Sequence, residues 1–113
     1  MKIILFNLPV FIDNDANVAG LAEALLGAGK GKPTCYYVTI STGIGGAFVV
    51  NGQLVSGGRG HAGEVGNIIV KNNGYKFGGL NPGAVEGEAS GTAITRKGKE
   101  ILGEERVHHA GDV

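Results

Sequence analysis

The chain has 113 residues but only one cysteine and no tryptophan. Cys35 has no second cysteine to pair with, so a disulfide within the chain is excluded and a cytoplasmic location is the default expectation. No apolar run is long enough to cross a bilayer. Residues 1–9 also lack the longer apolar core and cleavage site of a signal peptide. We therefore expect no association with a membrane.

Excess charge of either sign is absent too. Ten basic and ten acidic residues balance to a formal net charge of zero. A neutral chain offers no electrostatic attraction to nucleic acid, so we expect no nucleic-acid partner.

Glycine is abundant instead: it makes up 22 of the 113 residues, far above the usual share of roughly 7%. The glycines separate well-formed apolar segments and do not form a tract, which argues against low-complexity disorder. Tight turns close to a ligand explain such glycines better.

The patterning indicates an α/β chain. Pro9-Val10-Phe11-Ile12 is typical of a short buried strand, and a helix is expected over residues 16–28. The helical spacing predicts a packed apolar face made of Val18, Leu21, Ala22, Leu25 and Leu26.

The middle of the chain resembles antiparallel sheet. Strands are expected over residues 34–41 and 47–50, and Asn51-Gly52 is a strong type I′ hairpin signal. The remaining expected segments are a returning strand over 53–55, a loop over 56–66, a strand over 67–71, an irregular stretch over 71–83, a helix over 85–102 with a possible break at Ser90-Gly91, and a charged tail over 103–113.

Asn14-Asp15-Ala16-Asn17 follows the first strand and begins the helix. A carboxylate at such a junction lies at the mouth of the sheet, where open α/β folds bind ligands, and it could accept a proton from a sugar hydroxyl. A plain helix cap is the stronger interpretation from local sequence alone, because Asp and Asn are common caps.

Ser41-Thr42-Gly43-Ile44-Gly45-Gly46 follows a strand and could cradle phosphate with its backbone amides. It is not a Walker loop, because no Gly-Lys-Ser/Thr follows. The alternative is a simple hairpin bend.

Glu64 and Asn67, in a glycine-rich loop, could bind sugar hydroxyls, and Glu86 stands near the start of the last helix. A solvated loop is the alternative for the first two, and a helix-start carboxylate for Glu86. His61 is interpreted as a loop residue, and His108 and His109 are given no role.

The order and spacing of these motifs resemble the ROK family of repressors, open reading frames and kinases. That family carries Asn-Asp-Ala-Asn, then Gly-Thr-Gly-Ile-Gly-Gly, then Ala-Gly-Glu-hydrophobic-Gly-His, then Glu-x-x-Ala-Ser-Gly. The matching segments are 14–17, 41–46 with Ser41 for the first glycine, 62–67 with Asn67 for the histidine, and 86–91. The resemblance covers residues 9–102.

The resemblance implies a role for each matched residue. Asp15 would be the catalytic base, and Asn14, Glu64, Asn67 and Glu86 would bind the sugar. The residues expected to contact the ATP phosphates are Thr42, Gly43, Gly45 and Gly46. The implied reaction transfers the γ-phosphoryl group of Mg-ATP to a hexose, most commonly glucose, so ATP and Mg²⁺ are the expected cofactors.

The implied architecture is the ribonuclease-H-like, actin-type fold of two α/β domains. Residues 1–31 would end the first domain and residues 32–113 would begin the second. Many members hold a zinc ion with three cysteines and a histidine, whose positions fall here on Phe77, Gly79, Ala84 and Asn67. We therefore predict no structural zinc, and expect packing of Tyr75 and Phe77 to hold the 71–83 stretch.

The family's first phosphate motif, Asp-x-Gly-Gly-Thr, does not occur in the sequence. We expect the isolated chain to be a fragment with little or no kinase activity, and to form homo-oligomers through exposed half-domain surface. A sugar-responsive transcriptional regulator is the alternative, although no helix-turn-helix is visible. A non-catalytic sugar-binding module is a further alternative.

Overall fold

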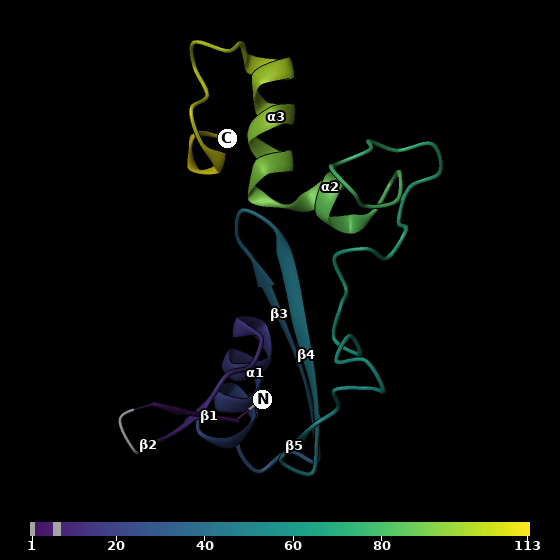
Figure 1. Ribbon diagram of the computed structural model, residues 1–113. Coiled ribbons are helices and arrows are strands. Elements are labelled where there is room, and N and C mark those ends of the chain that lie inside the picture. The colour runs from purple at the N-terminus through teal and green to yellow at the C-terminus, as the bar shows by residue number, and fades with distance from the viewer. Residues whose placement is uncertain (1, 6–7) are drawn as a thin grey trace. The chain divides into compact units, whose positions relative to one another are not determined.

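The computed structural model describes residues 2–5 and 8–113. Contacts between residues divide the chain into two compact units (Figure 1). The first unit contains Met1–Tyr37 and Ala47–Ala62, and the second contains Val38–Gly46 and Gly63–Val113. The predicted kinase-domain boundary after residue 31 stays a prediction.

A two-stranded antiparallel sheet opens the first unit, with β1 at Lys2–Leu5 and β2 at Leu8–Phe11. The strand predicted at 9–12 is confirmed, but its predicted burial is wrong. The side chain of Leu8 is 65% exposed and that of Phe11 is 77% exposed. The physical reason is that β2 is hydrogen-bonded to β1 alone within the described part of the chain, and the burial of a small sheet depends on what packs on it.

Helix α1, Asp15–Leu25, buries its small residues and exposes its large ones. Ala16, Gly20 and Ala24 are buried, while Val18 is 55% and Leu26 is 81% exposed. The predicted apolar face is therefore wrong. Small residues allow a close approach to the sheet: a Cβ atom at Gly20 would lie 3.0 Å from the Cβ of Tyr37 and closer still to that of Ala47.

The second sheet has the order β3–β4–β5, with β3 at Thr34–Ile40, β4 at Ile44–Val50 and β5 at Gln53–Leu54. The short connection between β3 and β4 requires antiparallel strands, as predicted. Asn51 and Gly52 both have positive φ, 49° and 74°, and they join the Val50↔Gln53 pair, which confirms the type I′ hairpin.

Residues 67–71 do not form the predicted strand. A single bridge pairs Ile69 with Ala84, and the side chains of Ile68, Ile69 and Val70 are more than half exposed. The backbone amides of Val70 and Lys71 both donate to the carbonyl of Gly83, so the chain turns away after one contact. β-branched composition alone cannot supply the neighbouring strand that a ladder needs.

The last predicted helix is broken at Ser90, as expected from the sequence. Helix α2 covers Val85–Ala89 and α3 covers Gly91–Leu102. Ser90 has extended backbone angles, and its fully buried hydroxyl accepts the amide of Ala93 at 3.2 Å. The described helices include none with the length and apolarity needed to cross a membrane.

The tail is ordered against α3 (Figure 1). It contains a short 3₁₀ helix, η1, at Ala110–Asp112, and Val107 is fully buried beside Gly98. The charged composition of residues 103–113 did not indicate this packing.

Candidate functional site

Asn14 and Asp15 lie in the first unit, at the junction between β2 and α1. Asn14 is the N-cap: its side-chain oxygen accepts the amides of Ala16 at 2.9 Å and Asn17 at 3.3 Å. The cap interpretation is therefore confirmed for Asn14. Its oxygen serves the helix, and its side-chain nitrogen is the group that can donate to a ligand. Asp15 is the exposed first residue of α1. A carboxylate at this position interacts favourably with the positive end of the helix dipole.

Asp13 also contributes to this junction, although it is Asn14, among the cap candidates of the Asp13-Asn14-Asp15 run, that caps the helix. Its carboxylate accepts the side-chain amide of Asn17 at 3.1 Å and the backbone amide of Asn14 at 2.7 Å. These two hydrogen bonds hold the pKa of Asp13 below its ordinary value, the Asn17 bond having the larger effect. The sequence signal for this role is the unbroken polar run from Asp13 to Asp15, which is longer than one cap requires.

In the second unit, the predicted phosphate turn is shorter than expected. The bend covers residues 41–43, and β4 begins at Ile44, so Gly45 and Gly46 lie in a strand. The start of α3 fixes this bend. The amide of Gly91 donates to the carbonyl of Ser41 at 2.7 Å, and the Thr92 hydroxyl donates to the carbonyl of Thr42 at 2.9 Å.

Glu86 reaches the same turn. Its Oε2 accepts the backbone amide of Ile44 at 2.7 Å. A Cβ atom at Gly43 would lie 2.6 Å from that oxygen, and one at Gly66 would lie 3.1 Å from it. A side chain at Gly66 is excluded by the backbone, because its Cβ atom would lie 2.5 Å from the carbonyl oxygen of Ile44. A side chain at Gly43 would instead displace the carboxylate of Glu86. The structure therefore joins one predicted sugar ligand to the predicted phosphate turn.

Asn67 and Glu86 lie on paired segments. The amide of Glu86 donates to the carbonyl of Gly66 at 3.0 Å, and the amide of Val85 donates to that of Ile68 at 2.8 Å. The side-chain oxygen of Asn67 accepts the amide of Asn81 at 3.0 Å, so its NH₂ group is the part that can donate to a sugar oxygen.

Glu64 is exposed, and both of its neighbours, Gly63 and Val65, are buried. The amide of Val65 donates to the carbonyl of Gly63 at 2.8 Å, so a hydrogen bond joins the two neighbours of Glu64. This placement is compatible with the predicted sugar contact, which stays a prediction.

An open pocket of about 510 Å³ adjoins the bend. Its polar lining includes Ser41, Thr42, Thr92, His108 and His109. The two histidines had no predicted role, and the sequence held no signal for their placement, because it depends on how the tail folds back. His109 also caps η1, where its Nδ1 accepts the amide of Gly111 and its backbone amide donates to Asp112.

The described residues contain no group of three or more His, Cys, Asp or Glu side chains that could hold a metal ion. The absence of structural zinc stays a prediction. The expected packing of Tyr75 and Phe77 is present: the guanidinium carbon of Arg96 lies 3.7 Å from the Tyr75 ring centroid, and Phe77 packs beside Gly87.

Comparison with known proteins shows the family to which these segments belong. The sequence pattern of the ROK family matches residues 4–110. The chain belongs to the ROK family. It is 40% identical over 100 residues to a glucokinase of Halalkalibacterium halodurans, a match that covers 88% of this chain and 30% of that protein. It is also 40% identical over 91 residues to the xylose repressor of Bacillus subtilis, covering 80% of this chain and 24% of the repressor.

Solved ROK structures show the fold. The ROK hexokinase of Thermus thermophilus superposes with a TM-score of 0.83 at 38% identity, covering 92% of this chain and 34% of the hexokinase. A Streptomyces griseus ROK glucokinase in complex with glucose and AMPPNP superposes with a TM-score of 0.76 at 38% identity, covering 84% and 30% of the two chains. The chain is thus part of the ribonuclease-H-like, actin-type α/β fold, and it spans about 30% of the length of the glucokinase that it matches.

Proposed function

We propose that this ROK chain carries sugar-binding and phosphate-binding segments of an ATP-dependent hexose kinase, with glucose as the preferred sugar. The observation that carries the proposal is the hydrogen bond of 2.7 Å from the Ile44 amide to the Glu86 carboxylate. The Oε2 of Glu86 holds the turn, and the Oε1 of the same carboxylate can accept a hydrogen bond from a different donor. Such a group suits a site where a sugar and a phosphate must meet.

The roles follow the matched motifs. Asp15 accepts the proton of the attacking sugar hydroxyl, and Asn14 donates a hydrogen bond to the same sugar. Glu64 and Glu86 accept hydrogen bonds from sugar hydroxyls, and Asn67 donates one. The residues assigned to the ATP phosphates are Thr42, Gly43, Gly45 and Gly46.

ATP and Mg²⁺ are the proposed cofactors. The pocket beside Thr42 supports this assignment, because its hydroxyl and imidazole lining could bind polar phosphate oxygens. When bound, ATP would supply the γ-phosphoryl group and Mg²⁺ would neutralise the negative charge that develops on it. A cytoplasmic location is part of the same proposal.

A sugar-responsive regulator is the second candidate, because the chain is as similar to the xylose repressor as to the glucokinase. The two candidates differ in the need for a base. In a full-length protein that carries this segment, Asp15→Asn should abolish phosphoryl transfer while leaving sugar binding within about twofold, since the asparagine keeps a hydrogen-bonding group of the same size. A regulator or a plain sugar-binding module would bind sugar without any transfer.

The first prediction is that the 113-residue chain binds glucose but turns it over very poorly. Phosphoryl transfer depends almost wholly on positioning and electrostatics, and the chain spans about a third of the length of related kinases. Calorimetric titration with glucose and a coupled ATP-consumption assay would measure the two properties. Robust saturable turnover would contradict the expected inactivity, and absence of sugar binding would contradict the proposed function.

A further inference from the structure

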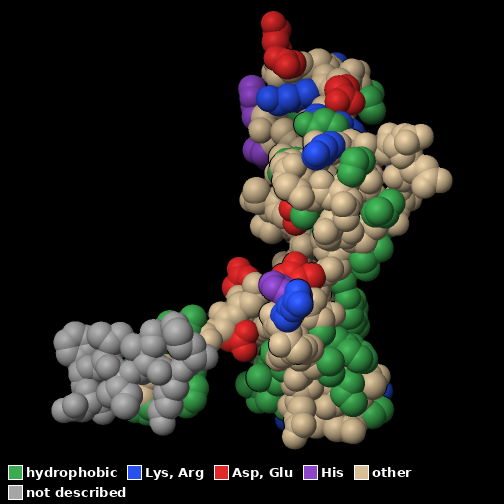
Figure 2. Space-filling model, turned by 45° about the vertical axis from the view of Figure 1, so that its right-hand side comes forward, with side chains coloured by type: hydrophobic (Ala, Val, Ile, Leu, Met, Phe, Trp, Pro, Cys, Tyr) green, Lys and Arg blue, Asp and Glu red, His purple; other side chains and the backbone are tan. Residues whose placement is uncertain are grey.

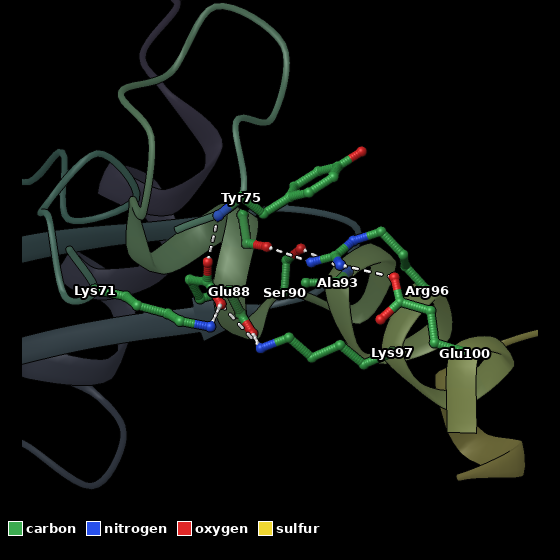
Figure 3. Close-up of polar contacts among 9 residues, drawn as sticks. Lys71, Tyr75, Glu88, Ser90, Ala93, Arg96, Lys97 and Glu100 are labelled. Carbon is green, nitrogen blue, oxygen red and sulfur yellow. Dashed lines mark hydrogen bonds and ion pairs between the residues drawn. The ribbon is translucent and has the colours of Figure 1, made fainter. Parts of the chain in front are cut away.

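The 71–83 loop is held by one carboxylate on α2, that of Glu88. The side chain of Glu88 is only 8% exposed. Its Oε1 accepts the backbone amide of Tyr75 at 2.7 Å, and its Oε2 accepts the Nζ of Lys97 at 2.9 Å (Figure 3). The Nζ of Lys71 lies 3.9 Å from the same oxygen. Both carboxylate oxygens are thus committed within the molecule.

Hydrogen bonds within the loop connect Glu88 to Asn67 of the predicted sugar site. The carbonyl of Tyr75 accepts the amide of Gly83 at 3.0 Å, which closes the loop on itself. The amide of Asn81 then donates to the side chain of Asn67 at 3.0 Å. Glu88 and Asn67 are therefore connected through Tyr75, Gly83 and the short segment between Asn81 and Gly83.

Arg96 makes a second contact between the loop and the helices. The guanidinium of Arg96 covers the Tyr75 ring, and its NH2 nitrogen donates to the carbonyl of Gly87 at 3.0 Å (Figure 3). Lys97 also donates to the carbonyl of Glu88 at 3.1 Å. The cations of α3 thus fix both the loop and α2, the helix that carries Glu86.

We propose that Glu88 is a positioning residue, which closes the 71–83 loop without a metal ion and thereby orients the Asn67 side chain for the sugar. The side-chain oxygen of Asn67 accepts a hydrogen bond from the loop, so its NH₂ group is left to donate to a sugar. The link to sugar rests on the proposed function. The closure of the loop does not, because it rests on contacts within the chain that involve no sugar.

The wild-type chain offers the first test. Lys97 and the Tyr75 amide hold the pKa of Glu88 below its ordinary value, with smaller contributions from Lys71. The amide resonance of Tyr75 should therefore shift as acid protonates Glu88, with a midpoint below the ordinary pKa of a glutamate. The Glu88→Gln chain should show no such shift, and Glu104→Gln, an equal charge change at an exposed position, should titrate like the wild type. A Tyr75 amide that does not respond to acid in the wild type would overturn the proposal, even if Glu88→Gln failed to fold.

The second test separates loop closure from sugar binding. In Glu88→Ala, hydrogen exchange of the Asn81 amide should be about tenfold faster, and glucose affinity should fall about fivefold, because the loop no longer orients Asn67. Glu104→Gln should change neither. Faster exchange with unchanged glucose affinity would overturn the positioning role. If the wild type binds no glucose, the proposed function fails, and the Asn81 exchange rate still decides whether Glu88 closes the loop.

Discussion

Gly20 lies where α1 comes closest to the second sheet of its unit. An added Cβ atom would meet the Cβ of Ala47, and the Cβ of Tyr37 at 3.0 Å. Ala47 is fully buried, so it has no free space into which to move. The residue that looks weakest in a helix by propensity is thus the one that the packing requires.

We predict that Gly20→Ala destabilises the chain by about 1–3 kcal/mol, the usual cost of overpacking a close contact. Helix propensity alone would favour alanine by up to about 1 kcal/mol, so the two effects oppose each other and the sign of the result is informative. Urea denaturation would measure it. The matched control is Gly58→Ala, at a loop position where no atom lies within 4 Å of the added Cβ. A Gly20→Ala chain more stable than the wild type would show that the contact relaxes at no cost.

Among the elements, the break between α2 and α3 depends on Ser90. Its hydroxyl is fully buried and accepts the amide of Ala93, one of the donors that a helix start leaves without an intrahelical partner. The same helix start holds the carbonyls of Ser41 and Thr42 in the bend before β4. Removal of the Ser90 hydroxyl should therefore weaken the contacts that hold the bend as well.

The prediction is that Ser90→Ala costs about 0.5–2 kcal/mol of stability, the range for removing a helix cap. The amide of Gly91, which donates to Ser41, should also exchange faster. Thermal unfolding and amide exchange would measure the two effects. Ser56→Ala, at an exposed loop position, is the control and should change neither. Unchanged exchange at Gly91 would mean that the bend is held independently of the cap.

Elements with a local cause could be predicted from the sequence, and those with a distant cause could not. The Asn51-Gly52 hairpin and the cap at Asn14 follow from the conformations that those residues adopt by themselves. The buried face of α1 depends on the sheet, which admits only small residues beside Ala47. Residues 67–71 would need a neighbouring strand in order to form a strand themselves, and their composition does not show whether one is present.

The candidate site divides in the same way. Its motifs indicated Glu86 and the turn, but not their hydrogen bond, which joins residues 42 positions apart in the chain. Glu88 carried no signal of its own, because an acidic residue near a helix start is ordinary. Its importance comes from Lys97, Lys71 and Tyr75, which only the folded chain brings to it.

At the scale of the whole molecule, the exposed apolar surface is the most consequential property. Figure 2 shows apolar side chains gathered on the surface. The large apolar residues of the first unit that are more than half exposed include Leu8, Phe11, Ile12, Val18 and Leu26. Large exposed apolar patches, unlike single exposed residues, usually mark surfaces at which another surface binds.

We therefore predict that the chain associates with itself as its concentration rises, because burial of apolar side chains is worth about 25 cal/mol for each Å² removed from water. Light scattering over a range of concentrations would measure the mean mass. The double substitution Val18→Lys with Leu26→Lys should lower that mass, since it places charge at an exposed position of α1 and at its exposed C-cap. The control, Gln53→Lys with Asn72→Lys, adds the same charge at exposed polar positions and should leave the mass unchanged if apolar contact drives association. A monomer at every concentration would contradict the prediction, and an equal effect of both double variants would assign the association to net charge instead.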